Sequence, residues 1–320
     1  MHISIAGRLG SGKSTISSIL NANHGFSVYS TGAIHREIAL QHKVSTLEMN
    51  QLMALDLSYD HAIDDAVTKI SIDRKDETII FDSRMAWKFA VKSYKVFVVV
   101  DPLVAASRVM GNQRGNEEVY TDLEDAKTKL IERSRLENER FIDIYGVNNL
   151  DYSNYNLVID STYSTPDILA NIIYDKFRDY CMSGAETHDV VMAPASLYPL
   201  AGISELNLKK LELYREKKEY LNSFATVIVF DGYHYIVDGY HQVLAAIMNG
   251  ESFIDVELVD TDNHSLFKSQ QHLISTIQAV GISAVHDFEK TGNFRYKSYP
   301  DYYFDPPLPN APDSRTTLRR

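Results

Sequence analysis

Glycine, lysine and hydroxyl residues stand close together near the start of the chain, in the order Gly7-Arg8-Leu9-Gly10-Ser11-Gly12-Lys13-Ser14-Thr15. This order fits the phosphate-binding pattern G-x-x-x-x-G-K-[ST] at every position. In such a loop the glycines let backbone N–H groups point at phosphate oxygens, the lysine reaches the β- and γ-phosphates, and the next hydroxyl coordinates Mg²⁺. We therefore expect the phosphates of a nucleoside triphosphate at Gly7, Gly10, Ser11, Gly12, Lys13, Ser14 and Thr15.

The residues on either side of this loop predict a strand and a helix. Residues 3–6 form a short apolar run, and Ile16, Ile19 and Leu20 recur at helical spacing after the loop. Strand, glycine-rich loop and helix, in that order, form the structural context that phosphate binding requires. A glycine-rich turn that arose by chance is the alternative.

A second group of candidate residues follows a later apolar run. Residues 78–81 predict a buried strand that ends in Asp82-Ser83-Arg84. Ligands of open parallel sheets bind at the carboxyl ends of the strands. Asp82 is therefore placed to hold Mg²⁺, and Arg84 is placed to reach the phosphate of an acceptor. The alternative is that Asp82 caps a helix that starts near Met85.

Two further segments carry residues that suit a phosphorylated acceptor. Thr31, Gly32 and Arg36 follow a strand predicted at residues 26–29, and an arginine fork matches phosphate oxygens. A helix cap with a surface arginine explains this segment equally well. Residues 45–70 predict a helix with Asp60 and Asp64 on one face. These carboxylates either contact a base or ribose or face solvent.

Arginines recur between residues 108 and 140. In a mobile lid, such cations stabilise charge on a transferring phosphoryl group while the closed lid excludes water. Pairing of Arg133 with Glu137 and of Arg135 with Glu139 on a helix surface explains part of the pattern. The candidate lid arginines are Arg108 and Arg114, which we expect to contact the ATP donor, and Arg133, Arg135 and Arg140, which we expect to be catalytic together with Lys13 and Arg84.

Alternating strand and helix signals predict an α/β fold with a doubly wound parallel sheet. Residues 96–100 form a continuous apolar run, typical of a strand covered on both faces. Residues 156–160 predict the last strand of a first domain over residues 1–180. We expect a linker at residues 181–193, a second, smaller α+β domain over residues 194–300 and an extended tail at residues 301–320.

Residues 1–180 resemble the archaeal-type cytidylate kinases, a family of nucleoside monophosphate kinases with a phosphate-binding loop (P-loop). The resemblance implies transfer of the γ-phosphoryl group of ATP to CMP or dCMP in the presence of Mg²⁺. It also implies that Arg36 and Arg84 hold the acceptor phosphate. Ser83 stands where that family usually has a glycine. The motifs that carry the resemblance are the loop, Ser30-Thr31-Gly32 with Arg36-Glu37, Asp60 and Asp64, Asp82-Ser83-Arg84, Asp101-Pro102-Leu103, the helix from Arg133 to Arg140 with Tyr145-Gly146, and residues 157–162.

The second half resembles the ParB/sulfiredoxin-like fold over residues 194–262. Two strands are predicted around the turn Asp231-Gly232, and Asp238-Gly239-Tyr240-His241-Gln242 then opens a helix before another strand. In the usual Asp-Gly-His-His-Arg signature of that fold, the first histidine and the arginine are phosphate ligands. Tyr240 and Gln242 replace them here, so we expect a binding or docking module at this position.

Composition narrows the classes of function. The net charge of −11 over 320 residues argues against general binding to nucleic acid. No apolar run reaches the length of a membrane span, and no leader pattern precedes the first strand. The single cysteine, Cys181, fits a reducing compartment, so we expect cytoplasmic localisation. The expected partner is a nucleoside monophosphate, and the sequence is compatible with a homo-oligomer.

The sequence is also compatible with two other functions. One is a P-loop kinase for another acceptor, such as a modified or DNA-borne nucleotide or a small hydroxylated metabolite. The other is a non-catalytic ATP-binding switch that controls a partner docked on the ParB-like domain.

Overall fold

The computed structural model describes residues 1–32, 58–111, 120–201, 207–218, 223–259, 267 and 269–303. The chain divides into two compact units, Met1–Ser196 and Leu197–Arg320. Among the helices of the described residues, none combines the length and the apolar character needed to cross a bilayer.

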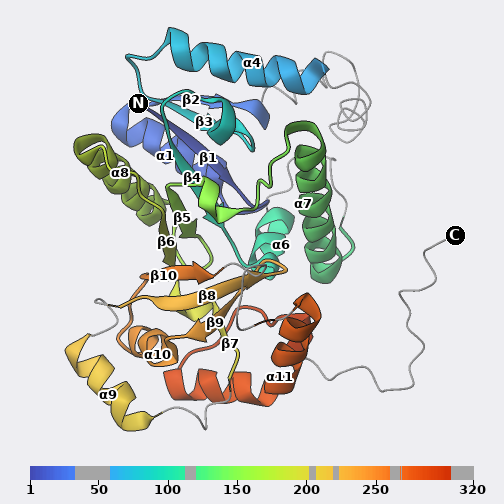
Figure 1. Ribbon diagram of the computed structural model, residues 1–320, viewed down its shortest axis with the longest axis vertical. Helices are drawn as coiled ribbons and strands as arrows, with labels where there is room; N and C mark the ends of the chain where they lie inside the picture. Colours follow the sequence, from blue (N-terminus) through green and yellow to red (C-terminus); the bar gives the residue numbers. More distant parts are fainter. Residues whose placement is uncertain are drawn as a thin grey trace, which may run out of the picture. The chain divides into compact units, whose positions relative to one another are not determined.

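The first unit is built on a parallel sheet with the strand order β2-β3-β1-β4-β5-β6 (Figure 1). Its strands are β1 (His2–Gly7), β2 (Ser27–Ser30), β3 (Ile79–Asp82), β4 (Ser93–Val99), β5 (Leu157–Asp160) and β6 (Asp189–Met192). Every residue of β1, β3 and β5 is buried, which is typical of parallel strands covered on both faces. The prediction of a parallel α/β sheet is confirmed.

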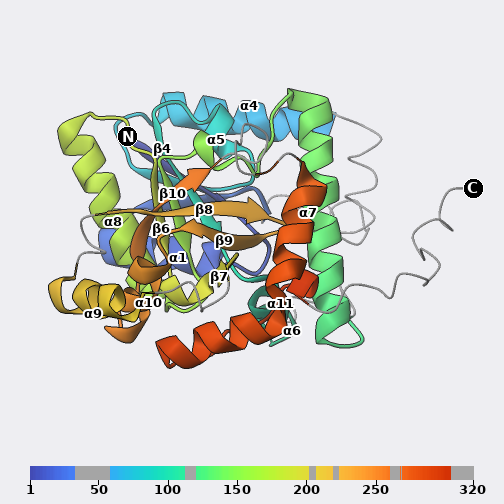
Figure 2. The same ribbon diagram turned by 60° about the horizontal axis from the view of Figure 1, so that its bottom comes forward.

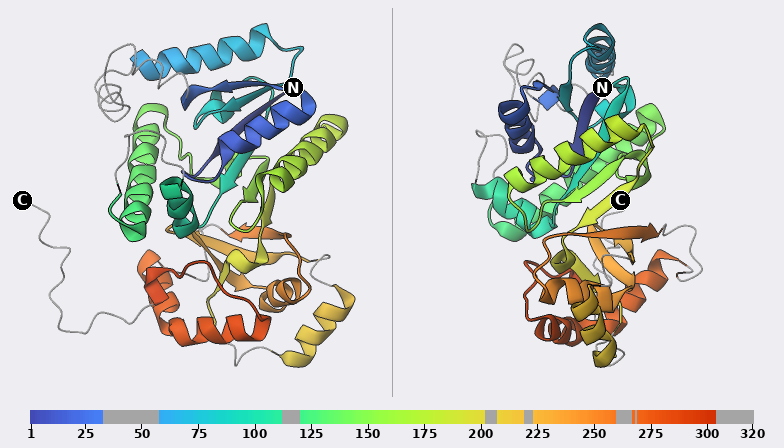
Figure 3. Two further views of the ribbon diagram at one scale, coloured as in Figure 1. Left: turned by 180° about the vertical axis from the view of Figure 1, so that it is seen from behind. Right: turned by 90° about the vertical axis from the view of Figure 1, so that its left-hand side faces the viewer.

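Helices cover both faces of this sheet. Helices α1 and α8 pack against each other on one face, as the view from behind in Figure 3 shows. On the other face, α4 and α5 share a hydrophobic core with β3 that includes Val67, Phe81 and Ala86. The helices of this unit are α1 (Lys13–His24), α4 (Ser58–Asp73), α5 (Ala86–Phe89), α6 (Pro102–Gly111), α7 (Leu123–Tyr145) and α8 (Pro166–Ser183), with 3₁₀ turns η1 (Tyr152–Asn154) and η2 (Pro194–Ser196).

Helix α7 has well-defined ends. The Asp122 carboxylate caps its start by accepting a hydrogen bond from the backbone N–H of Asp125, and Gly146 ends it with a φ of 65°. The helix packs against α6 through a core that contains Ala126 and Leu130. These contacts set the orientation of α7, and with it the direction of the arginines that α7 carries.

The structure differs from the expectation of a linker at residues 181–193. Helix α8 continues to Ser183, and β6 then pairs with β5 in parallel, with Val190 opposite Val158. Residues Val190, Val191 and Met192 are buried. This strand was missed because its short apolar run is flanked by polar residues, and β5 is therefore not the last strand of the first unit.

The second unit has a smaller sheet with the strand order β10-β8-β9-β7. Strands β8 and β9 form the predicted hairpin around Asp231 and Gly232, both at positive φ, and β10 pairs with β8 in parallel. Helix α11 is bent at Gly281, and Figure 2 shows its two segments. The elements are β7 (Leu197–Pro199), β8 (Ala225–Phe230), β9 (Tyr233–Asp238), β10 (Ile254–Val259), α9 (Leu208–Lys217), α10 (Tyr240–Met248), α11 (Gln270–Gly292) and the 3₁₀ turn η5 (Asp301–Tyr303).

The start of the expected tail belongs to the packed part of the second unit. Tyr303 is 1% exposed, and its hydroxyl donates to the carbonyl oxygen of Pro199. Tyr296 donates in the same way to the carbonyl oxygen of Leu197, at 2.7 Å. Through these two hydrogen bonds, the end of the described chain is attached to the backbone of β7. The rest of the expected tail, residues 304–320, lies outside the described residues.

Candidate active site

The phosphate-binding loop lies between β1 and α1, and two of its glycines are required by close backbone contacts. A Cβ atom at Gly7 would lie 2.3 Å from the carbonyl oxygen of Val98 on β4, and Gly7 has a φ of 147°. A Cβ atom at Gly10 would lie 2.8 Å from the carbonyl oxygen of Ala105 on α6. The loop is therefore held between β4 and α6, and its glycines are needed for packing as well as for shape.

The loop ends where α1 begins. Gly12 is the N-cap residue, with a φ of 87°, and it offers no side chain to the N–H groups of the first turn. Ser14 and Thr15 belong to that turn, which carries no acidic residue. A helix start of this kind presents backbone donors and the positive end of the helix dipole to an anion.

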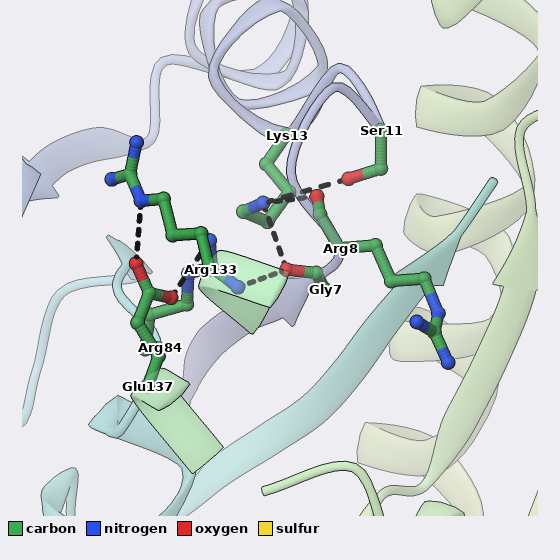
Figure 4. Close-up of polar contacts among 7 residues, drawn as sticks. All are labelled: Gly7, Arg8, Ser11, Lys13, Arg84, Arg133 and Glu137. Atoms are coloured by element: carbon green, nitrogen blue, oxygen red, sulfur yellow. Dashed lines mark hydrogen bonds and ion pairs between the residues drawn. The ribbon is translucent and has the colours of Figure 1, made fainter. Parts of the chain in front are cut away.

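Two cations meet at the carbonyl oxygen of Gly7. Lys13 Nζ donates to it at 3.0 Å and also donates to the carbonyl oxygen of Arg8 at 2.9 Å. Arg84 Nη1, from the segment that follows β3, donates to the same Gly7 oxygen at 2.9 Å. Figure 4 shows both side chains converging there, whereas the side chain of Arg8 points away. The predicted donor-side lysine and acceptor-side arginine are thus neighbours.

The carboxylate of Glu137 lies between two of the candidate arginines (Figure 4). Its Oε1 accepts a hydrogen bond of 2.9 Å from Arg133 Nε, and its Oε2 lies 3.3 Å from Arg84 Nη2. Burial by itself would raise the pKa of Glu137, but the positive charges of Arg84, Arg133 and Lys13 outweigh it and lower the pKa. Glu137 is therefore ionised at neutral pH.

Ser14 and Asp82 form the candidate metal position. Ser14 Oγ donates a hydrogen bond of 2.8 Å to Asp82 Oδ2, at the carboxyl end of β3. One hydroxyl and one carboxylate oxygen suit Mg²⁺, which takes oxygen ligands and commonly completes its shell with water and substrate phosphates. In the part of the chain that the structure describes, no group of three or more His, Cys, Asp or Glu side chains is arranged to hold a metal ion.

Asp60 and Asp64 face α7, and each is 7% exposed. Arg140 Nη2 lies 3.1 Å from Asp60 Oδ1, and the Tyr145 hydroxyl donates to Asp64. Burial is the main cause that raises the pKa of Asp64, to about 6. The alternative that these carboxylates face solvent is wrong, because they continue the buried stripe of α4 that includes Val67.

Other candidates are placed less centrally. Arg108 donates to the backbone and hydroxyl of Ser161 and, at 3.5 Å, to the carbonyl oxygen of Gly10, so it lies beside the loop. Arg135 is paired with Glu132 and Glu139, and its side chain is 53% exposed. The structure therefore does not bring Arg135 to the group around Gly7.

Thr31 and Gly32 follow β2 at the same end of the sheet as Arg84, because Ser30 is opposite Asp82 in the parallel register. This common edge is the arrangement that the strand order predicts for an acceptor site. The candidates Arg36 and Arg114 lie outside the described residues.

The sequence predicts Glu137 only as a surface partner of Arg133, whereas the structure places it centrally, between Arg133 and Arg84. A signal was present, because Glu137 continues the buried stripe of α7 formed by Ala126, Leu130 and Ser134 and then by Phe141. An acidic residue in phase with a buried stripe needs a partner of opposite charge. The identity of its second partner, Arg84, has no local signal.

The sequence of this chain is similar to that of a known protein family. The family model "Cytidylate kinase-like family" matches residues 2–163. A cytidylate kinase of Thermoplasma volcanium is 29% identical over 182 residues, which cover 56% of this chain and 92% of that protein. A cytidylate kinase of Sulfolobus acidocaldarius is 32% identical over 174 residues, which cover 54% of this chain and 92% of that protein. A cytidylate kinase of Methanosarcina mazei is 35% identical over 173 residues, which cover 53% of this chain and 94% of that protein. With half of its length matched by the family model, the chain belongs to the cytidylate kinase-like family.

Proposed function

We propose that this chain transfers the γ-phosphoryl group of ATP to a nucleoside monophosphate, with CMP or dCMP as the preferred acceptor. The observation that carries the proposal is the convergence of Lys13, Arg84 and Arg133, from three separate elements, beside a phosphate-binding loop. Phosphoryl transfer between two phosphorylated reactants needs such a cluster of cations, because charge accumulates on the transferring group. Support for the choice of acceptor comes from the cytidylate kinases that the chain resembles.

On the donor side, the backbone N–H groups from Gly10 to Thr15 would hold the phosphates of ATP. Lys13 would exchange the carbonyl oxygens of Gly7 and Arg8 for the β- and γ-phosphates. Ser14 and Asp82 would hold Mg²⁺, which when bound neutralises charge on those phosphates. An oxygen of the acceptor phosphate attacks the γ-phosphorus, the bond to the β-phosphate oxygen breaks, and ADP leaves.

On the acceptor side, Arg84 would hold the phosphate of the monophosphate, and Arg133 would bring α7 to the transferring group. Positioning is the main contribution, because little covalent chemistry is left for the protein to perform. Asp60 and Asp64 lie beside Arg140 and Tyr145 and would contact the nucleoside. Thr31, Gly32 and Arg36 remain predicted acceptor contacts, and Arg108 and Arg114 remain predicted donor contacts.

For the second unit we infer a ParB/sulfiredoxin-like fold used for binding or docking. The order of β8, turn, β9, α10 and β10 supports this inference, as does the parallel pairing of β10 with β8. The hydroxyl of Tyr240 donates to the carbonyl oxygen of Ile236 at 2.6 Å and accepts from the N–H of Leu200 at 3.1 Å. Because the Tyr240 hydroxyl is used for these internal contacts, we infer a docking role for the second unit in preference to phosphoryl transfer.

The test is an ADP-release assay with ATP, Mg²⁺ and each ribo- and deoxyribonucleoside monophosphate in turn. Preferred turnover of CMP or dCMP is expected. Preferred turnover of a purine monophosphate would contradict the proposed acceptor. ATP binding with no turnover of any monophosphate would favour the switch or another acceptor in place of the proposal.

A further inference from the structure

We propose that Glu137 is an internal competitor for the acceptor phosphate: before the acceptor binds, its carboxylate holds Arg84 and Arg133, and the acceptor must displace it. The inference rests on the proposed function, because it assigns a regulatory element to the same site. It goes beyond that function because it predicts that the wild-type chain binds its acceptor less tightly than its arginines would allow.

The contacts of Glu137 resemble those of a bound oxyanion (Figure 4). One carboxylate oxygen accepts from Arg133 at 2.9 Å, and the other lies 3.3 Å from Arg84 Nη2. The first contact is a charge-assisted hydrogen bond and the second is an ion pair without a hydrogen bond, and arginines bind the oxygens of a phosphate through contacts of the same charge type. Glu137 therefore presents to both guanidinium groups the kind of charge and geometry that an acceptor phosphate would present.

Burial separates this contact from the ion pairs that Arg135 makes on the same helix. The side chains of Glu137 and Arg84 are 25% and 21% exposed, whereas Glu132 and Glu139, which pair with Arg135, are 52% and 54% exposed. Exposed pairs of the second kind contribute little, because water screens them. The Glu137 contact is shielded, and it joins α7 to the segment after β3, which are far apart in the chain.

Competition follows from these positions. A dianionic phosphate that enters beside Gly7 meets the Glu137 carboxylate, which repels it. It also meets Arg133, whose Nε already donates to Glu137, and Arg84, whose Nη1 donates to Gly7 and whose Nη2 is within ion-pair distance of Glu137. A phosphate that takes Arg133 Nε and Arg84 Nη2 displaces Glu137 from these two atoms. The free energy needed to release Glu137 is subtracted from the acceptor affinity, while the same contacts keep α7 attached to the loop until an acceptor arrives.

Glu137→Gln in the full chain tests the proposal, because the amide keeps the size of the side chain and removes its charge. The probes are inorganic phosphate and CMP, each titrated by calorimetry in the absence of ATP. We expect the dissociation constants of both to fall by about tenfold, the value of one charge-assisted contact. The matched control is Glu139→Gln on the exposed face of α7, which should leave both constants unchanged.

Unchanged or weaker phosphate binding by Glu137→Gln would overturn the proposal, because the carboxylate would then order the arginines instead of competing for them. If Glu137→Gln does not fold, as judged by its melting curve, Glu137→Asp replaces it. The shorter aspartate keeps the charge but withdraws it from the arginines, so tighter phosphate binding is again expected, and equal or weaker binding would overturn the proposal.

The result is separable from the proposed function. If no monophosphate is turned over but Glu137→Gln binds phosphate more tightly, the competitor stands and the assigned reaction fails. If CMP is turned over and the variants bind phosphate no more tightly than the wild type, the competitor alone fails.

Discussion

The hydroxyl of Ser14 donates a hydrogen bond of 2.8 Å to Oδ2 of Asp82, and this bond joins the first turn of α1 to the carboxyl end of β3. The two residues are far apart in the chain. They meet because β1 and β3 are adjacent parallel strands, with Ile5 opposite Asp82. The proposed Mg²⁺ ligands are thus held together by the central strands of the sheet.

Replacement of Asp82 by asparagine should raise the Mg²⁺ concentration needed for half-maximal turnover by about 10- to 100-fold, because a charged oxygen ligand is lost. The measurement is turnover as a function of Mg²⁺ at saturating ATP and CMP. Asp73→Asn is the control, since Asp73 is an exposed carboxylate that pairs with Lys69. An unchanged Mg²⁺ requirement in Asp82→Asn would remove Asp82 from the metal site.

Lys13→Ala should lower kcat by about 100-fold or more, because a preorganised charge that stabilises the transition state is removed. The fold should persist, since the contacts of Lys13 in the loop are to part-buried oxygens of Gly7, Arg8 and Ser11. Turnover and the melting curve are measured together, with Lys69→Ala as the surface control. Turnover close to that of the wild type would show that Lys13 has no part in the transfer.

Gly7→Ala adds a close contact to backbone strain, whereas Gly12→Ala introduces backbone strain alone. A Cβ atom at Gly7 meets the backbone of Val98 at 2.3 Å, so we expect the free energy of unfolding to fall by about 3 kcal/mol or more. Gly12 has open space around such an atom and only its positive φ to oppose it, which costs about 1–2 kcal/mol. Urea unfolding measures both. Equal losses in the two variants would contradict the packing of the loop against β4.

Asp64 should make stability depend on pH between about 4 and 6. Burial raises its pKa in the folded chain from 3.8 to about 6, so the folded state keeps the proton that the unfolded state releases. The contribution of Asp64 to the free energy of unfolding is therefore fully present below about pH 4. It is lost as the pH rises to about 6, which lowers the free energy of unfolding by up to about 3 kcal/mol.

Replacement of Asp64 by asparagine tests this dependence, because the amide oxygen still accepts from Tyr145 and carries no charge. The variant should unfold at higher urea concentration than the wild type at pH 7.5 and at a similar concentration at pH 4. The difference between the two chains is the quantity compared, since other carboxylates titrate in both. A difference that is the same at both pH values would show that folding does not raise the pKa of Asp64.

A chain truncated after Ser196 should fold as an intact first unit, whereas a chain truncated after Tyr180 should not. A chain that ends at Ser196 keeps β6, and it also keeps the hydrogen bond of 2.5 Å from Ser196 to the buried Asp160. A chain that ends at Tyr180 leaves the edge of β5 unpaired. We expect its melting temperature to be lower by about 10 °C or more, and we expect turnover of CMP only in the longer chain. Equal melting temperatures would show that β6 does not stabilise the first unit.

The sequence determined the local parts of this site. A phosphate-binding loop is encoded in consecutive residues, because its glycines and lysine act through backbone shape and the start of one helix. The positions of Asp82 and Arg84 at the end of a strand could also be predicted, since an apolar run of parallel-strand type ends there. The hairpin at Asp231 and Gly232 was predictable because an Asp-Gly turn between two strand signals is itself a local pattern.

Only the tertiary structure decided which charged residues meet. Arg133 and Arg135 are two positions apart and look equivalent in sequence, but helical geometry turns them to different sides of α7. One contacts Glu137 and the other pairs with exposed carboxylates. The contact of Glu137 with Arg84 depends on how α7 packs beside the sheet, and no local pattern records that packing. Long-range contacts of this kind come from the burial of whole helix faces, so the local sequence could name the candidates but not their partners.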